Sequence, residues 1–280
     1  MIKAVMLYFG NNMMSSDSYP CSDFRERYKN DRRAKNFRIA ETRHLFDYGL
    51  WKEATELMRR GRLNTVVVEL SEGVIYPSHP ELAVEGSWEP TRLQDELKRL
   101  RKMGLDPIPK LNFSTTHCAW QKQWRRLTST PEYYRFCSDI IGDVCEIFEK
   151  PSHFHIGMDE EWETSQVYDP LVVLRHGDLW CHDCRYLINE VEKRGVRCAM
   201  WADWLRSHPD ICQQHIPKSV LLHNWYYAEL FNPAEFPPPP WSPIGYHSYR
   251  KLDDLGYVQF PTGSNWCGPR IMGMTVRLCL

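Results

Sequence analysis

The chain has 280 residues, of which 42% are hydrophobic and 25% are charged, as in an ordinary globular protein. This composition excludes a disordered chain, a collagen and a coiled coil. Lys and Arg total 35 against 36 for Asp and Glu, so no strong positive field favours nucleic acid or an anionic membrane as partner. No apolar stretch approaches the roughly 20 residues that span a bilayer.

Ten cysteines are spread along the chain. The N-terminal run MIKAVMLYFG is short and has no small-residue cleavage site, so it predicts a first strand and not a signal peptide. We therefore expect reduced thiols in a cytoplasmic protein. Cys181 and Cys184 have the CxxC spacing, but a zinc site of this kind needs a second such pair, and the sequence has none. We expect two cysteines on a helix, with no metal and no cofactor.

Strands and helices alternate along the chain. Short β-branched or apolar runs predict strands at residues 3–9, 65–70, 107–113, 153–158, 197–201, 219–225 and 257–261. Apolar residues at helical spacing predict helices near 42–60, 91–103, 131–149, 179–194 and 248–255. A shorter helical stretch follows the fifth strand. The second strand is apolar on both faces, which is typical of a parallel sheet that is buried on both sides.

This alternation, without a long linker, predicts one α/β domain over residues 1–280. The two candidate folds are an open doubly wound sheet and the (β/α)8 TIM-type barrel. The sequence has no glycine-rich phosphate loop, and its polar and aromatic residues cluster after the strands, which favours the barrel. No convincing eighth strand follows Trp266. Either two strands merge near Tyr246, or the chain ends before the barrel closes.

The fourth strand runs directly into three consecutive carboxylates, in the segment HIGMDEE at residues 155–161. Neighbouring side chains of a strand point to opposite faces, so two consecutive acids within a strand could not both face the barrel axis. They can do so where the strand becomes a loop. Two carboxylates held close together raise the pKa of one of them, and a protonated Glu is what a general acid needs. The alternative is a solvated acidic turn that starts the next helix.

The motif HIGMDE resembles the HxGGDE motif of glycoside hydrolase family 20, the β-N-acetylhexosaminidases. Weaker resemblances to this family follow the same order over about residues 45–266. They are LNTVVVEL at 63–70, Tyr76-Pro77 with Pro80-Glu81-Leu82, Gly86-Ser87-Trp88, residues 101–109, His117, Met200-Trp201-Ala202-Asp203, Asn224-Trp225 and Gly256-Tyr257.

Several positions depart from the pattern of this family. The first strand is followed by Gly10-Asn11-Asn12 where the family has Arg, and the third strand has Lys110 and Asn112 where an acidic residue is typical. Met158 replaces the second glycine of the motif. The resemblance therefore implies a divergent barrel. It supports a retaining glycosidase more firmly than it supports N-acetylglucosamine as the sugar.

The resemblance implies hydrolysis of terminal β-linked hexosamine-type sugars by substrate-assisted catalysis. The 2-acetamido oxygen of the substrate would attack the anomeric carbon. Glu160 would protonate the leaving oxygen and then activate water, while Asp159 would orient the acetamido group. The residues expected to bind the sugar are Trp201, Asp203, Trp225, Trp266, Glu69, Asn112, His117 and His155. The expected partner is a carbohydrate, and neither nucleic acid nor a membrane is expected.

Two other functions stay open. The first is a metal-dependent barrel hydrolase, because His117, His155, Asp159, Asp203 and His223 all fall near strand ends. Against it, HExxH and an HxH pair at the end of a strand are missing. The second is a barrel that binds carbohydrate without cleaving it, which the missing Arg favours and the retained acid pair disfavours. Glu161 is the reserve candidate for the acid.

Overall fold

The strands form one parallel sheet in chain order. The structure is a computed structural model and describes residues 2–10, 42–166, 171–227 and 247–264. Its strands are β1 (Ala4–Tyr8), β2 (Thr65–Glu69), β3 (Asp106–Lys110), β4 (His153–His155), β5 (Arg197–Trp201), β6 (Leu221–Trp225) and β7 (Gln259–Thr262). Each strand pairs in parallel with the next one along the chain.

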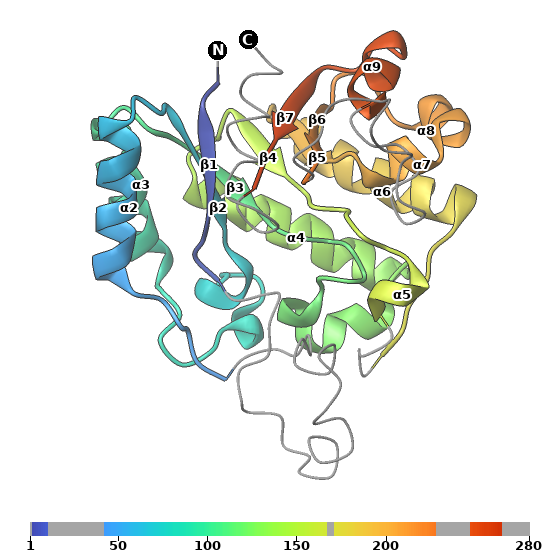
Figure 1. Cartoon of the computed structure of the whole chain (residues 1–280). Helices are drawn as coiled ribbons and strands as arrows, with labels where there is room; N and C mark the ends of the chain where they lie inside the picture. Colours follow the sequence, from blue (N-terminus) through green and yellow to red (C-terminus); the bar gives the residue numbers. More distant parts are fainter. Residues whose placement is uncertain (1, 11–41, 167–170, 228–246, 265–280) are drawn as a thin grey trace, which may run out of the picture.

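Helices alternate with the strands along the chain and pack beside them. They are α2 (Tyr48–Arg60), α3 (Pro90–Lys102), α4 (Pro131–Ile147), α5 (Glu163–Gln166), α6 (Gly177–Glu192), α7 (Asp203–Ser207), α8 (Pro209–His215) and α9 (His247–Asp254), with shorter 3-10 turns η2 (Ser71–Gly73), η3 (Pro80–Leu82) and η4 (Ala119–Leu127). Figure 1 shows α2 and α3 beside the first strands and α6 to α9 beside the last. In the described part of the chain, no helix combines the length and the apolar character needed to cross a membrane.

The sheet curls into a barrel. A narrow cavity between the amino-terminal ends of the strands is lined by side chains from β1, β2, β3, β4, β6 and β7, among them Ala4, Val67, Ile108, His153, His223 and Phe260. Because Ala4 and Phe260 line the same cavity, β1 and β7 face each other across it, although they are not hydrogen-bonded neighbours. The prediction of a TIM-type barrel is confirmed, with seven strands among the described residues.

Local signals explain where the helices begin. The Asp47 carboxylate accepts a hydrogen bond from the N–H of Leu50 at 3.0 Å, so α2 begins at Tyr48 and not at Thr42 as predicted. The residues from Thr42 to Phe46 are not helical, and Arg43 forms a β-bridge with Glu85 instead. The prediction thus missed the capping aspartate and extended the helix too far toward the N-terminus.

β4 ends earlier than predicted, at His155 and not at Met158. Gly157 has φ +76° and Met158 has φ +71°, which are left-handed conformations that a strand does not contain. A Cβ on Gly157 would lie 2.0 Å from Oδ1 of Asn112, so this position requires glycine. The left-handed turn begins the loop that carries the three acids.

Some expectations fall outside the described residues. They concern Trp266, a merging of two strands near Tyr246 and any strand after Trp266. Whether the barrel has an eighth strand therefore stays open, and the single-domain organisation stays a prediction.

Candidate active site

Asp159 and Glu160 follow β4 and lie side by side. Glu160 has φ +55°, so left-handed residues stand on both sides of Asp159. This backbone interrupts the alternation of a strand, and it lets two neighbouring carboxylates face the same way. The Asp159 side chain is 15% exposed and the Glu160 side chain 34%. Of the two acids, Glu160 is therefore the more accessible to a ligand.

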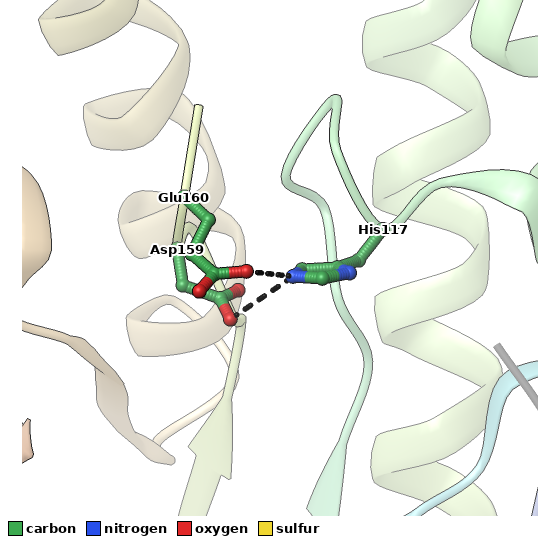
Figure 2. A group of neighbouring side chains, drawn as sticks. All are labelled: His117, Asp159 and Glu160. Atoms are coloured by element: carbon green, nitrogen blue, oxygen red, sulfur yellow. Dashed lines mark ion pairs between the residues drawn. The ribbon is translucent and has the colours of Figure 1, made fainter. Parts of the chain in front are cut away.

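His117 bridges the two carboxylates. Its Nε2 lies 3.3 Å from Oδ2 of Asp159 and 3.3 Å from Oε2 of Glu160, as Figure 2 shows. The imidazole is fully buried and comes from the loop between β3 and η4. The structure thus brings His117 from the end of one strand to the acid pair at the end of the neighbouring strand.

The loop after β3 holds the loop after β4 in place. Nδ2 of Asn112 donates a hydrogen bond to Oδ1 of Asp159 at 2.7 Å. The hydroxyls of Ser114 and Thr116 donate to the backbone carbonyls of Asp159 and Glu160, each at 2.6 Å. Asn112 therefore orients Asp159 directly, and its neighbours fix the backbone of both acids.

The surroundings of Asp159 keep it ionised. Burial acts to raise the pKa of this carboxyl, but His117, Lys110 and the hydrogen bond from Asn112 outweigh burial, and the pKa lies below its ordinary range. Asp159 is therefore a charged acceptor at neutral pH, able to stabilise a positive charge or to orient an N–H group.

Asp203 begins α7 and lies beside Glu160 with its side chain fully buried. Its Oδ2 accepts a hydrogen bond from the backbone N–H of Glu160 at 3.2 Å, and its Oδ1 accepts one from Nε1 of Trp225 at 2.6 Å. The Arg206 guanidinium lies 3.5 Å from Oδ1 and 4.3 Å from the centre of the Trp225 ring. Burial above all, with the charges of Asp159 and Glu160, raises the pKa of Asp203 to about 7.

The third acid of the motif points away from the site. Glu161 is buried and forms an ion pair with Arg175, and it accepts a hydrogen bond from the N–H of Thr115 at 3.0 Å. Arg175 also pairs with Asp183 of α6 at 3.0 Å and donates to the carbonyl of Phe113 at 3.1 Å. Glu161 therefore anchors the loop to the helix layer, which excludes it as the reserve acid.

Three of the predicted sugar-binding residues lie in the barrel interior. Glu69 is fully buried and forms an ion pair with Lys110 of the neighbouring strand. The Trp201 ring lies 4.8 Å from the ring of His155, which is fully buried and lies 4.5 Å from the ring of His223. These surroundings suit a support for the pocket. Contact between these residues and a sugar stays a prediction.

Sequence reasoning missed two tyrosines near the acids. Tyr8 ends β1 and pairs with Glu69 in the sheet, while the ring of Tyr227 stacks on Trp225 with centroids 4.8 Å apart. Burial of the hydroxyl groups, followed by nearby carboxylates that include Asp159, raises the pKa of both phenols. Their positions, at the end of the first strand and just after the sixth, are the signal that would have identified them.

His117, Asp159 and Glu160 also have the spacing of a metal site. One ligand atom from each lies within 4.8 Å of the others, and an imidazole with two carboxylates is a donor set that suits a divalent transition metal. Cys181 and Cys184 lie buried on α6, as predicted, and no metal-binding group that includes them is found in the described residues.

Comparison with known proteins finds no matching family profile and no matching curated protein. Solved structures do match. A family 20 exo-β-N-acetylglucosaminidase from Vibrio harveyi, in complex with N-acetylglucosamine, aligns with a TM-score of 0.59 and 16% identity, over 81% of this chain and 43% of that one. A family 20 β-N-acetylhexosaminidase from Streptomyces coelicolor A3(2) aligns with a TM-score of 0.60 and 14% identity, over 82% and 52%. Dispersin B aligns with a TM-score of 0.59 and 15% identity, over 83% and 77%.

These matches define the fold as a parallel α/β barrel. This chain spans about half of the length of the Vibrio and Streptomyces enzymes, and most of the length of Dispersin B. The chain has the barrel fold of the family 20 β-N-acetylhexosaminidases, at 13% to 17% sequence identity to them.

Proposed function

We propose that this chain is a retaining exo-glycosidase that hydrolyses terminal β-linked N-acetylhexosamine-type sugars. The observation that carries the proposal is the meeting of Asp159 and Glu160 at His117, at the carboxyl end of β4. This is the end of the barrel where TIM-barrel enzymes place their catalytic groups. The fold shared with family 20 enzymes supports the same substrate class.

The proposed mechanism uses the substrate as its own nucleophile. The 2-acetamido oxygen attacks the anomeric carbon, while Glu160 transfers a proton to the departing glycosidic oxygen. The positive charge that develops on the acetamido group lies against Asp159. Water then attacks the anomeric carbon, the bond from that carbon to the acetamido oxygen breaks, and Glu160 takes the proton from the water. Configuration at the anomeric carbon is retained because it is inverted twice.

The different surroundings of the two acids support this division of roles. Asp159 is less exposed and is bound by Asn112 and His117, which suits a fixed anionic group. Glu160 is more exposed and reaches the same imidazole, which suits a group that exchanges protons with substrate and water. Trp225 and Tyr227 stack on each other beyond Asp203 and would form an aromatic wall for the sugar.

The test is the turnover of aryl β-glycosides with and without a 2-acetamido group. We expect cleavage only where that group is present. Glu160→Gln should lose about 10²- to 10⁴-fold in rate on a disaccharide, whose leaving group needs protonation, and far less on a nitrophenyl glycoside. Asp159→Asn should slow both substrates alike. Glu163→Gln, a change of an exposed carboxylate in α5, is the matched control and should retain full activity.

Thermal melts must accompany each rate, so that loss of structure is recognised. Full activity of Glu160→Gln on the disaccharide would show that this carboxyl is not the acid. Binding of amino sugars without any turnover would favour the carbohydrate-binding barrel instead.

A metal-dependent hydrolase is the second candidate, because the His117, Asp159 and Glu160 ligand atoms lie within 4.8 Å of one another. Dialysis against EDTA separates the two candidates. The substrate-assisted mechanism needs no metal, so we expect the rate to survive chelation. A rate that disappears with EDTA and returns with a divalent cation would overturn the proposal in favour of metal-assisted hydrolysis.

A further inference from the structure

One carboxylate connects the backbone of Glu160 to the aromatic wall, defined here as Trp225 and Tyr227. We propose that Asp203 is a positioning residue that sets the place of the Glu160 carboxyl relative to this wall, and so relative to a bound sugar. The inference rests on the proposed function, since it takes Glu160 as the acid and the aromatic wall as part of the sugar pocket.

The first end of the connection is the peptide of Glu160. A residue with a side chain rarely adopts φ +55°, so this conformation needs partners outside the loop. The N–H of Glu160 donates to Oδ2 of Asp203 at 3.2 Å, and its carbonyl accepts from the hydroxyl of Thr116 at 2.6 Å. The backbone that aims the Glu160 carboxyl is therefore held from α7 on one side and from the loop after β3 on the other.

The second end of the connection is the Trp225 indole. Nε1 of Trp225 donates to Oδ1 of Asp203 at 2.6 Å, and Arg206 donates from Nη1 to the carbonyl of Trp225 at 2.6 Å. The Arg206 guanidinium also lies 4.3 Å from the centre of the indole ring, and Tyr227 stacks on that ring. The aromatic wall thus has a fixed orientation, and Asp203 is bonded directly to its Trp225.

Because the two oxygens of Asp203 serve different partners, one substitution separates the two ends. In Asp203→Asn only one oxygen can accept, so either the peptide of Glu160 or the indole of Trp225 loses its partner. A misplacement of about 1 Å between acid and substrate costs on the order of 10²-fold in rate. We expect kcat on a disaccharide to fall by about that factor, with KM changed less than about threefold.

Trp225→Phe breaks the same connection from its other end, because it keeps an aromatic ring and removes the indole N–H. If Asp203 acts through this bond, the variant that combines Asp203→Asn with Trp225→Phe should be no slower than the slower single variant. Both substitutions then act on the same hydrogen bond. Additive losses in the double variant would overturn the connection. Asp210→Asn, an exposed change on α8, is the matched control and should leave kcat and KM unchanged.

The proton NMR resonance of the Trp225 indole N–H gives a readout that does not depend on activity. It is assigned by its absence in Trp225→Phe. We expect it to be protected from exchange in the wild type. It should move in Asp203→Asn, because the indole then either bonds a neutral amide oxygen or loses its partner, but it should not move in Asp210→Asn. An unmoved resonance would overturn the connection, and a moved resonance with unchanged kcat would overturn the positioning role. A wild-type protein without turnover would overturn the proposed function, while the resonance shift would still support the bond.

Discussion

The barrel interior should make this protein sensitive to acid, because it contains histidines that are held neutral. The ring of His223 lies 4.5 Å from that of His155 and 5.1 Å from that of Phe260, and the residue is 8% exposed. Burial above all, with the nearby charges of His153 and Lys110, lowers the pKa of His223 from 6.5 to about 3. As pH falls from 6.5 toward 3, the His223 side chain of the unfolded protein binds a proton that the same side chain of the folded protein does not bind.

The free energy of unfolding therefore decreases as the pH is lowered from 6.5 toward 3. The contribution of His223 is fully present above pH 6.5, and each pH unit below that removes about 1.4 kcal/mol. Between pH 7 and pH 5 the loss is about 2 kcal/mol. Asp203 acts in the opposite direction, because its pKa of about 7 in the folded state lies above the ordinary 3.8. The pH dependence of the free energy of unfolding contains both contributions. The contribution of His223 is therefore measured as a difference between the wild type and a His223 variant.

His223→Phe keeps a ring of similar size and removes the titrating group. We expect this variant to lose about 2 kcal/mol less than the wild type between pH 7 and pH 5. Urea unfolding at both pH values, with reductant to keep the cysteines free, measures the difference. His182→Phe, an exposed change on α6, should behave as the wild type does. Equal losses in His223→Phe and the wild type would refute the reasoning.

Two further predictions concern the loop of the acids. Gly157→Ala should destabilise the fold by about 2–4 kcal/mol in the same urea assay, because its Cβ would collide with Asn112 at a left-handed position. Gly177 is also left-handed, but a Cβ there would meet nothing within 4 Å, so Gly177→Ala should cost only about 1 kcal/mol. Equal costs would contradict the collision. Glu161→Gln should lower stability by about 3 kcal/mol by removing one partner of the buried Arg175, yet keep the wild-type dependence of rate on the leaving group. A loss confined to poor leaving groups would make Glu161 the acid.

Much of the fold was predictable because its signals are local. The run TVVVE of β2 is buried at every position, and its two apolar faces indicated a parallel sheet before the structure was known. The paired acids were also predictable, since three carboxylates directly after a buried strand are unusual. His117 was recognisable through the family resemblance and its place near a strand end, but nothing near it in the sequence shows that it contacts Asp159.

The geometry of the site depends on contacts between distant segments, which local patterns do not contain. Neither Met158 nor Glu160 favours a left-handed conformation, and the peptide of Glu160 is held by Asp203 from a different helix. The burial of Glu161 depends in the same way on Arg175, which follows it by 14 positions. The sequence was sufficient to name the three acids. It did not indicate which two would face His117 and which one would be buried against Arg175.

The Arg175 cluster also has a consequence for how the site unfolds. One guanidinium binds the carbonyl of Phe113, the carboxylate of Glu161 and the carboxylate of Asp183, so the loops after β3 and β4 are tied to α6 at a single buried point. Opening the loop of the acids alone would remove Glu161 from the buried Arg175 guanidinium, at a cost of several kcal/mol. The loop should then open only when the core opens, so that its amide hydrogens exchange at the rate of global unfolding and heat removes activity and structure in one cooperative step.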